Sequence, residues 1–376
     1  MKRIFTIGVL CFLVGSLYAG FNPGTIKWQN HNRKYTIYVP DIYYTEGKSV
    51  PLLLGLHGFG DDINNFSHIC MTGIADTANY IAVYAEGWPD AVLGVNSWNS
   101  GASILNVPFN NGIDDVGFLN ALIDTVIANY DIDTTRMYVY GFSFGAFMTN
   151  RMASESTNRF AAVAAVSGLR GNMRTAIPSR EMPIVYFHGT NDQTINFYNC
   201  PYGLNATNTL NFWIDNNNCD PTPASIDTLP DLANDAIRVV RFRYSNGTNG
   251  SRVDFYKEIG AGHEWLGLPA NDISACQTIW SFFREFRNDR VAAGIKNKSA
   301  EKLSLYPNPS NNTISFELPK QQANISVHVF NSSGADVSKY TQVSNDKISI
   351  GSLAKGMYFI SIDAGETTYS GSFVKQ

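Results

Sequence analysis

Charged side chains are scarce in this sequence. Lys, Arg, Asp and Glu make up 16% of its 376 residues, against roughly 25% in an average soluble domain. The 28 basic and 32 acidic residues give a formal net charge of −4. A protein whose main partner is a nucleic acid needs clustered Lys and Arg to neutralise phosphates. The composition therefore argues against a nucleic-acid partner.

Long hydrophobic runs are also lacking after the N-terminus. The apolar run Ile4–Leu17 follows Lys2 and Arg3 and is too short for a comfortable membrane span, a pattern typical of a signal peptide. Ala19 offers a small residue at the cleavage position, so residues 1–19 are predicted to be removed. No later stretch reaches the ~18 apolar residues that a spanning helix needs. The sequence predicts a protein that is secreted, either extracellular or at the cell surface, with no membrane span.

Cysteine is rare, with five residues in the whole chain. Cys11 lies in the middle of the predicted signal peptide, between two large side chains, and is interpreted as an ordinary residue of the apolar run. The other four are Cys70, Cys200, Cys219 and Cys276. An even number in an exported chain predicts two disulfides, and all three connectivities remain open.

Motifs for metals and organic cofactors are absent as well. The sequence contains no C-x-x-C pair, no H-E-x-x-H, no G-x-G-x-x-G and no P-loop. The acidic pairs before predicted helices are explained by helix capping. No metal and no cofactor is therefore expected.

What the sequence does contain, across residues 20–289, is an alternation of strand-like and helix-like segments. Apolar runs rich in Val, Ile and Tyr, such as 51–56 and 136–140, alternate with amphipathic stretches such as 114–129 and 272–287. Near-continuous apolar strands between such helices predict an α/β domain, whose mostly parallel sheet is covered on both faces.

The remaining part of the chain has a different character. Residues 290–302 are charged and rich in small side chains, which is typical of a linker. Residues 303–376 lose the helical pattern and contain short alternating strands separated by turn signals. They predict a small all-β module.

The stretch Gly141-Phe142-Ser143-Phe144-Gly145 directly follows one of the predicted strands and precedes a predicted helix. This turn is so tight that it needs glycine on both sides of the serine, and it projects the hydroxyl from the end of the strand. The next backbone N–H lies at a helix N-terminus, where it stabilises developing negative charge. Ser143 is therefore the predicted nucleophile, and Phe144 N–H a predicted oxyanion donor.

A serine nucleophile needs a base and an acid that orients the base. His263 lies in a glycine-rich loop between the last strand and the last helix of the domain, where the chain order Ser…acid…His places the base. Asp192 follows a strand between these two positions and is the predicted acid. His57 and His188 each precede a glycine directly after a strand, so we expect their rings to bond local backbone groups.

A second oxyanion donor is expected from the turn His57-Gly58-Phe59-Gly60, which follows an early strand. Phe59 N–H is the favoured donor and Gly60 N–H the alternative. We further predict that Trp98 and Trp265 form an aromatic wall for the substrate.

Taken together, six stretches resemble the polyhydroxybutyrate depolymerase-like esterases, and feruloyl and acetylxylan esterases of carbohydrate esterase family 1 are similar. They are Pro51–Asp62, Asp114–Ala121, Arg136–Ala146, Phe160–Gly168, Pro183–Asp192 and Gly260–Trp265. The resemblance covers about residues 35–287. It implies an α/β-hydrolase fold, a Ser143–Asp192–His263 triad and no cofactor. The chain departs from many relatives in having Gly-Ala, in place of Gly-Gly, after the elbow Ser-Phe.

The C-terminal module has a resemblance of its own. Leu305–Ser310, Leu353–Ile360 and Phe373–Gln376 resemble a type IX secretion sorting domain. This implies export across an outer membrane, the secretion machinery as a partner, and removal of the tail. A carbohydrate-binding β-sandwich is the alternative interpretation.

These observations predict a secreted serine carboxylesterase that hydrolyses acyl esters, with feruloyl or acetyl groups on a plant polysaccharide such as xylan as the expected substrates. One alternative is an extracellular depolymerase of polyhydroxybutyrate or another polyester. An alternative of another class is a catalytically inactive binding protein on a hydrolase scaffold. Acyl specificity is expected to depend on the loops 87–111 and 197–235.

Overall fold

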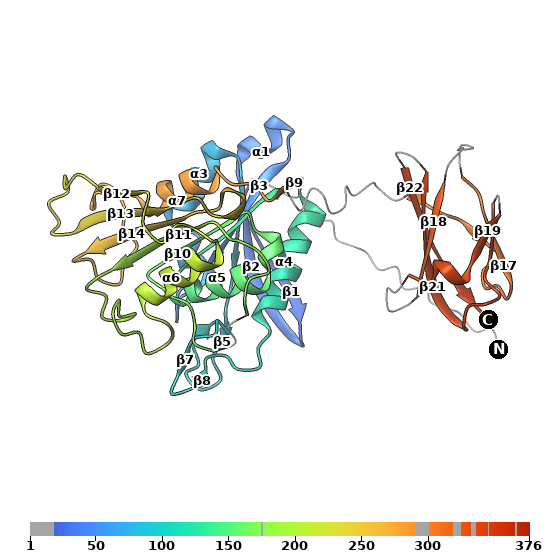
Figure 1. Cartoon of the computed structure of the whole chain (residues 1–376), viewed down its shortest axis with the longest axis horizontal. Coiled ribbons are helices and arrows are strands. Elements are labelled where there is room, and N and C mark those ends of the chain that lie inside the picture. Colours follow the sequence, from blue (N-terminus) through green and yellow to red (C-terminus); the bar gives the residue numbers. More distant parts are fainter. Residues whose placement is uncertain are drawn as a thin grey trace, which may run out of the picture. The chain divides into compact units, whose positions relative to one another are not determined.

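The computed structural model describes residues 19–173, 176–289, 301–318, 325–331, 336–344, 346–364 and 367–376 (Figure 1). These residues divide into two compact units, one before residue 290 and one after residue 300. Residues 1–18 of the predicted signal peptide and 290–300 of the predicted linker lie outside the described residues.

A ten-stranded sheet forms the centre of the first unit, in the order β1-β2-β4-β3-β9-β10-β11-β14-β13-β12. The six central strands run parallel and are β4 (Ile81–Ala85), β3 (Val50–Leu56), β9 (Ile132–Phe142), β10 (Ala162–Val166), β11 (Ile184–Gly189) and β14 (Val253–Ile259). Two antiparallel strands flank each side: β1 (Gly20–Trp28) with β2 (His31–Val39), and β13 (Arg238–Tyr244) with β12 (Ser225–Thr228). The predicted α/β architecture is confirmed.

Helices cover both faces of this sheet, as near-continuous apolar strands require. The helices are α1 (Asp41–Glu46), α2 (Ile63–Phe66), α3 (Cys70–Ala78), α4 (Asp115–Asn129), α5 (Phe144–Glu155), α6 (Ala206–Asn216) and α7 (Ala275–Phe283). Side chains of α4, α5 and α6 pack into one hydrophobic core, and those of α2, α3 and α7 pack into a second core on the other face (Figure 1). Among the described residues, no helix combines the length and the apolar character needed to cross a bilayer.

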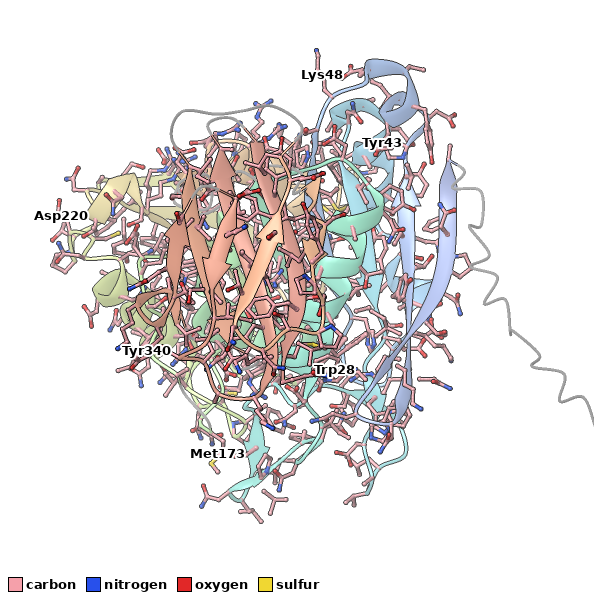
Figure 2. The ribbon with its side chains drawn as sticks, turned by 90° about the vertical axis from the view of Figure 1, so that its right-hand side faces the viewer. Trp28, Tyr43, Lys48, Met173, Asp220 and Tyr340 are labelled. Atoms are coloured by element: carbon pink, nitrogen blue, oxygen red, sulfur yellow. A yellow bond between two sulfur atoms is a disulfide. The ribbon has the colours of Figure 1, made fainter. Side chains whose placement is uncertain are left out.

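The parallel strands all end at the same edge of the sheet, which we call the carboxyl edge. Figure 2 shows the two ends of this unit, with Tyr43 and Lys48 at one end and Met173, in the loop after β10, at the other. Two small hairpins follow β4 at the carboxyl edge, β5 (Trp88–Pro89) with β6 (Asn96–Ser97) and β7 (Ser103–Ile104) with β8 (Val107–Pro108). Short 3₁₀ helices occupy Thr157–Arg159 and Thr248–Gly250.

The second unit is all β, as predicted. One sheet has the order β15-β22-β21-β18, with β15 (Glu301–Lys302), β22 (Thr367–Lys375), β21 (Gly356–Ala364) and β18 (Ser326–Asn331). The other has the order β16-β17-β20-β19, with β16 (Leu305–Tyr306), β17 (Thr313–Phe316), β20 (Lys347–Ser349) and β19 (Gln342–Ser344), and a 3₁₀ helix spans Ser338–Tyr340. Both sheets contribute to one core, so this unit has a hydrophobic interior of its own.

Candidate active site

Ser143 lies at the junction between β9 and α5 at the carboxyl edge. Its backbone has φ 54° and ψ −120°, a region that residues other than glycine rarely adopt and that is typical of strained functional turns. A Cβ atom at Gly145 would collide with the Leu56 carbonyl oxygen, and one at Gly141 would collide with the backbone of Gly145. The glycines on both sides of the serine are therefore required by close backbone contacts, as the motif predicted.

His263 and Asp192 complete a continuous line of hydrogen bonds with this serine. His263 Nε2 lies 2.9 Å from Ser143 Oγ, and His263 Nδ1 lies 2.8 Å from Asp192 Oδ2. Asp192 is fully buried, and its Oδ1 accepts the N–H groups of Thr194 and Ile195 at 2.8 and 2.7 Å. The structure thus brings together the three residues that were predicted from placement along the chain.

The charge state of Asp192 follows from these contacts. Burial acts to raise the pKa of Asp192, but the hydrogen bonds from His263 and from Ile195 N–H outweigh it, so the pKa lies below its ordinary value. An ionised carboxylate accepts only, so His263 donates through Nδ1–H. His263 Nε2 is then free to accept the hydroxyl proton of Ser143.

The turns that carry the acid and the base are bonded directly to each other. Thr190 N–H donates to the Glu258 carbonyl at 2.9 Å, and Asn191 N–H donates to the Ala261 carbonyl at 2.9 Å. Gly260 N–H donates to Thr190 Oγ1 at 3.0 Å. Because β11 and β14 are neighbours in the sheet, their following turns leave side by side and hold the aspartate and the histidine in register.

The other two histidines near the carboxyl edge bond backbone groups, as expected. His57 accepts Gly87 N–H at Nε2 (2.9 Å) and lies 2.7 Å from the Gly58 carbonyl at Nδ1. His188 Nε2 lies 2.7 Å from the Ile195 carbonyl. Both rings are fully buried, and burial lowers the pKa of each below its ordinary value. They brace the neighbouring turns as neutral imidazoles.

Two backbone N–H groups remain available near the serine. Within the described part of the chain, neither Phe59 N–H nor Phe144 N–H donates to a protein acceptor. Gly60 N–H, the alternative donor, already donates to the Asn96 carbonyl at 2.8 Å. The turn approaches the serine closely, since a Cβ at Gly58 would lie 3.4 Å from the serine Cβ. This arrangement favours Phe59 over Gly60, and the oxyanion role stays a prediction.

The predicted substrate wall needs correction. Trp98 is fully buried in the core, and its indole N–H donates to the His57 carbonyl at 2.9 Å. It cannot face a substrate there, so the prediction of a substrate contact for Trp98 is wrong. It supports instead the turn that carries Phe59. Trp265 is half-buried, and its ring lies 6.2 Å from that of Phe142, so its substrate role stays a prediction.

An aromatic cluster that the sequence analysis missed lies directly beside the serine. The rings of Phe59 and Phe109 lie 5.2 and 4.8 Å from that of Phe144, and Tyr202 lies 5.9 Å from it. Phe59 is 39% exposed, whereas Phe109 and Phe144 are buried. The sequence signal was partial, because Phe109 and Tyr202 belong to the two loops to which specificity was assigned.

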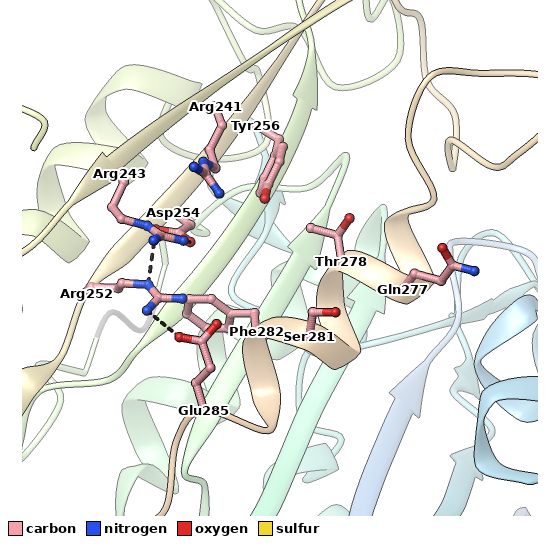
Figure 3. Close-up of a pocket in the computed structure, with 10 residues that line it drawn as sticks. All are labelled: Arg241, Arg243, Arg252, Asp254, Tyr256, Gln277, Thr278, Ser281, Phe282 and Glu285. Carbon is pink, nitrogen blue, oxygen red and sulfur yellow. Dashed lines mark hydrogen bonds and ion pairs between the residues drawn. The ribbon is translucent and has the colours of Figure 1, made fainter. Parts of the chain in front are cut away.

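A separate cavity of about 340 Å³ lies between β13, β14 and α7 (Figure 3). Its walls include Arg241, Arg243, Arg252, Tyr256, Gln277 and Thr278, and none of the predicted site residues. Each guanidinium group is paired with a carboxylate: Arg241 with Asp227 at 2.6 Å, Arg243 with Asp254 at 2.8 Å, and Arg252 with Glu285 at 2.7 Å. Because each arginine is paired in this way, the charged residues of the cavity form an ion-pair network.

One group of carboxylates in the described residues is close enough to share a cation. It consists of Asp231, Asp235 and Asp272, whose oxygens lie within 4.8 Å of one another. Asp272 Oδ1 already accepts the N–H groups of Leu232 and Ala233, at 2.6 and 2.7 Å. The group organises the turn before β13, and none of its members is a predicted site residue.

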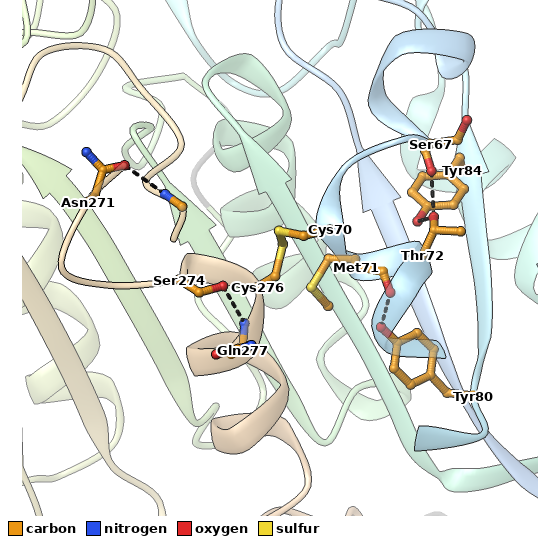
Figure 4. Close-up of a disulfide and its surroundings, with 11 residues drawn as sticks. Ser67, Cys70, Met71, Thr72, Tyr80, Tyr84, Asn271, Ser274, Cys276 and Gln277 are labelled. Atoms are coloured by element: carbon orange, nitrogen blue, oxygen red, sulfur yellow. Dashed lines mark hydrogen bonds between the residues drawn. A yellow bond between two sulfur atoms is a disulfide. The ribbon is translucent and has the colours of Figure 1, made fainter. Parts of the chain in front are cut away.

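The cysteines form one disulfide in place of the two that were predicted. Cys70 at the start of α3 is bonded to Cys276 at the start of α7, across 206 positions of sequence (Figure 4). Cys200 and Cys219 are both buried and free, so the prediction of a second bridge is wrong. They lie in different surroundings, since Cys219 Sγ contacts the Ser251 carbonyl at 3.8 Å, whereas Cys200 lies in the loop before α6. Burial raises the pKa of Cys200, and it raises that of Cys219 to about 11.

Comparison with known families agrees with this fold. Residues 38–220 match the phospholipase/carboxylesterase family, and residues 304–376 match the secretion system C-terminal sorting domain. The segment that contains Ser143 and Asp192 is thus similar to the phospholipase/carboxylesterase family, and the predicted α/β-hydrolase resemblance is confirmed. The sorting domain indicates export to an extracellular or surface location.

Several curated relatives are similar over 68–76% of this chain. A bifunctional acetylxylan esterase/xylanase of Neocallimastix patriciarum is 26% identical over 76% of this chain, which spans 38% of that relative. A probable feruloyl esterase C of Aspergillus niger is 25% identical over 68% of this chain and 85% of its own length. A poly(3-hydroxyalkanoate) depolymerase C of Paucimonas lemoignei is 23% identical over 70% of this chain and 64% of its own length. Among solved structures, an acetyl xylan esterase from Aspergillus awamori aligns with a TM-score of 0.48 at 14% identity, over 70% of this chain and 99% of that one.

Proposed function

We propose that this chain is an exported serine carboxylesterase that hydrolyses feruloyl or acetyl esters on a plant polysaccharide such as xylan. The observation that carries the proposal is the unbroken line of hydrogen bonds from Asp192 through His263 to Ser143, at 2.8 and 2.9 Å. An inactive binding protein would have no need for a strained serine that is aligned with a base and an acid.

In the proposed reaction, Ser143 Oγ attacks the ester carbonyl while His263 Nε2 takes the hydroxyl proton. Asp192 stabilises the imidazolium that forms. The Phe59 and Phe144 N–H groups hold the oxyanion of the tetrahedral intermediate. His263 then gives its proton to the leaving alcohol oxygen, and an acyl ester on Ser143 remains. A water molecule, deprotonated by His263, hydrolyses this ester and releases the acid.

The side chains beside the serine support an acyl group with apolar or aromatic character. Phe59 presents a partly exposed ring, and Phe109 and Tyr202 pack against Phe144. A partly exposed aromatic ring can pack against a flat aromatic acyl group such as feruloyl. The names of relatives, feruloyl esterase and acetylxylan esterase, support the same substrate class.

A second candidate substrate is an aliphatic polyester, because the tips of the hairpins at the carboxyl edge expose uncharged aliphatic side chains. Residues 91–113 contain no Asp, Glu, Lys or Arg. At the tips of the two hairpins, Val92 is 88% exposed and Leu105 is 91% exposed. Exposed aliphatic side chains without charge suit a water-insoluble aliphatic surface, and one relative is a poly(3-hydroxyalkanoate) depolymerase.

For the C-terminal unit we propose recognition by a type IX secretion machinery, followed by removal of the tail. The match of residues 304–376 to the secretion sorting domain supports this role. The unit has a core of its own, so it is able to act as a separate signal.

The decisive experiment measures hydrolysis by the purified protein of p-nitrophenyl acetate, methyl ferulate, acetylated xylan and polyhydroxybutyrate side by side. Ser143→Ala should abolish turnover of every substrate without changing the melting temperature, because it removes one oxygen atom. A fluorophosphonate probe should label the native chain and leave this variant unlabelled. Failure of the probe to label the native protein would overturn the proposal in favour of an inactive binding protein.

A further inference from the structure

Glu258 lies on β14 where the strand meets both turns of the proposed triad. Its carbonyl accepts Thr190 N–H from the turn that leads to Asp192, at 2.9 Å. The same carbonyl accepts Ala261 N–H from the turn that leads to His263, at 3.3 Å. The backbone carbonyl of Glu258 therefore holds both the turn that carries the acid and the turn that carries the base.

The side chain of Glu258 is enclosed in the protein. Successive strand residues point to opposite faces of a sheet, so Glu258 shares the face of Tyr256, which packs into the core beneath α3 and α7. Glu258 is fully buried, and within the described residues neither of its carboxyl oxygens has a hydrogen-bond partner. A carboxylate in such a place lacks both water and donors, and this favours the neutral acid.

Neighbouring charges act in the same direction. Burial, and after it the fields of Glu264 and Asp192, raise the pKa of Glu258 well above its ordinary value. On the adjoining strands, Glu258 stands opposite Gly189 of β11 and Val239 of β13, which do not titrate. The titratable and charged groups around it are Tyr256 on its own strand and Arg241 on β13, which is paired with Asp227. Asp192, His263 and Glu264 lie on the adjoining turns.

Packing alone does not explain an acid at this position. A glutamine or an apolar side chain of similar length would fill the same space without the cost of keeping a proton at neutral pH. Functional sites often contain buried acids whose pKa is shifted by their surroundings. What distinguishes Glu258 is its place below the two turns on which the geometry of Asp192 and His263 depends.

We propose that Glu258 is a positioning residue of the site, whose carboxylic acid packs beneath the Asp192 and His263 turns and whose loss of a proton separates them. This inference rests on the proposed function. It goes further by assigning the alkaline limit of activity to a residue that touches neither substrate nor the reacting atoms.

The direction of the pH effect follows from linkage. In the unfolded chain Glu258 ionises near pH 4.3, as an ordinary glutamate does, whereas in the folded chain it keeps its proton to a higher pH. The stability of the native protein therefore falls, relative to a variant with no acid at this position, as the pH rises above that value. The loss ends only when the folded protein itself releases the proton.

The test compares the native protein with Glu258→Gln, which is neutral at every pH and nearly identical in shape. Melting temperatures should coincide near pH 4 and diverge above it, with Glu258→Gln the more stable at pH 8. The alkaline limb of kcat/KM on p-nitrophenyl acetate should move upward by about one pH unit or more in this variant. Glu46→Gln is the matched control, because it makes the same change on an exposed glutamate of α1 and should leave both profiles close to native.

A third measurement separates this proposal from the proposed function. The downfield proton resonance of the His263–Asp192 hydrogen bond should disappear from the native protein at alkaline pH and persist in Glu258→Gln, and it requires no turnover. If the native protein hydrolyses no ester but this difference appears, the proposed function fails while the positioning role stands. The positioning role would be overturned if the profiles of the two proteins coincided or if only the melting temperature changed. An equal effect of Glu46→Gln would overturn it as well. Should the glutamine variant not fold, Glu258→Met tests the same removal of the acid in an apolar setting.

Discussion

Asp192→Asn is the substitution that most directly tests the proposed mechanism, because the surroundings of this residue determine how an amide must sit. Asp192 Oδ1 accepts two backbone N–H groups, from Thr194 and Ile195, at 2.8 and 2.7 Å. An asparagine keeps both bonds only if its carbonyl oxygen takes the Oδ1 position. Its NH₂ group then occupies the Oδ2 position, which lies 2.8 Å from His263 Nδ1 in the native protein.

The consequence is a change of tautomer. Because the NH₂ group donates, His263 Nδ1 must accept, and the imidazole proton moves to Nε2. Nε2 faces Ser143 Oγ at 2.9 Å and can then no longer take the hydroxyl proton. The same exchange in a serine protease triad lowers kcat by about 10⁴, equivalent to about 5 kcal/mol of transition-state stabilisation, and we expect a loss of this order. The two retained backbone bonds should limit the fall in melting temperature to a few degrees, roughly the effect of 1 kcal/mol.

The assay is kcat/KM on p-nitrophenyl acetate at pH 8, together with a thermal melt of each protein. Asp215→Asn, an exposed acid on α6, is the matched control and should behave as the native protein does. A folded Asp192→Asn variant that keeps more than about a tenth of native activity would refute the tautomer argument, since a tenfold loss corresponds to only about 1.4 kcal/mol.

Two further predictions concern the disulfide and the tail. Replacing Cys70 and Cys276 with serine should lower the free energy of unfolding in urea by about 3–5 kcal/mol, because the bridge closes a loop of 206 residues; an unchanged midpoint would contradict this. A chain that ends after Asp289 should hydrolyse a soluble ester at the native rate, because the C-terminal unit has a core of its own. In the native host the truncated enzyme should remain in the periplasm, and secretion that survives the deletion would refute the sorting role.

The parts of the fold that the sequence predicted are those with local signals. The central strands are apolar along their whole length, because both faces of the sheet are covered. The turn around Ser143 can be recognised in the sequence because glycine is required on both sides of the serine, where backbone contacts leave no room for a side chain. His263 and Asp192 were found from chain order, which follows from the way parallel strands end at one edge of the sheet.

The errors have a common physical origin in contacts between distant positions. Whether Trp98 faces a substrate or the core depends on its bond to the His57 carbonyl, 41 positions away. The cysteines raise the same problem, because a disulfide requires two Cα atoms about 6 Å apart. The fold gives 5.9 Å for Cys70 and Cys276 and leaves Cys200 and Cys219 as separate thiols. Neither outcome is encoded in local composition or spacing.

The placement of Glu258 illustrates a further step that sequence patterns do not reach. The sequence of β14, Val-Asp-Phe-Tyr-Lys-Glu-Ile, predicts a strand with three charged residues. Nothing in this sequence distinguishes the glutamate from the other two. Its position acquires meaning only because β11 is the neighbour of β14, so that the turns after both strands bond to one carbonyl group. The alignment of acid and base at this site is thus a property of main-chain contacts between two strand ends. A substitution that disturbs these contacts should affect the triad even when it alters none of its three side chains.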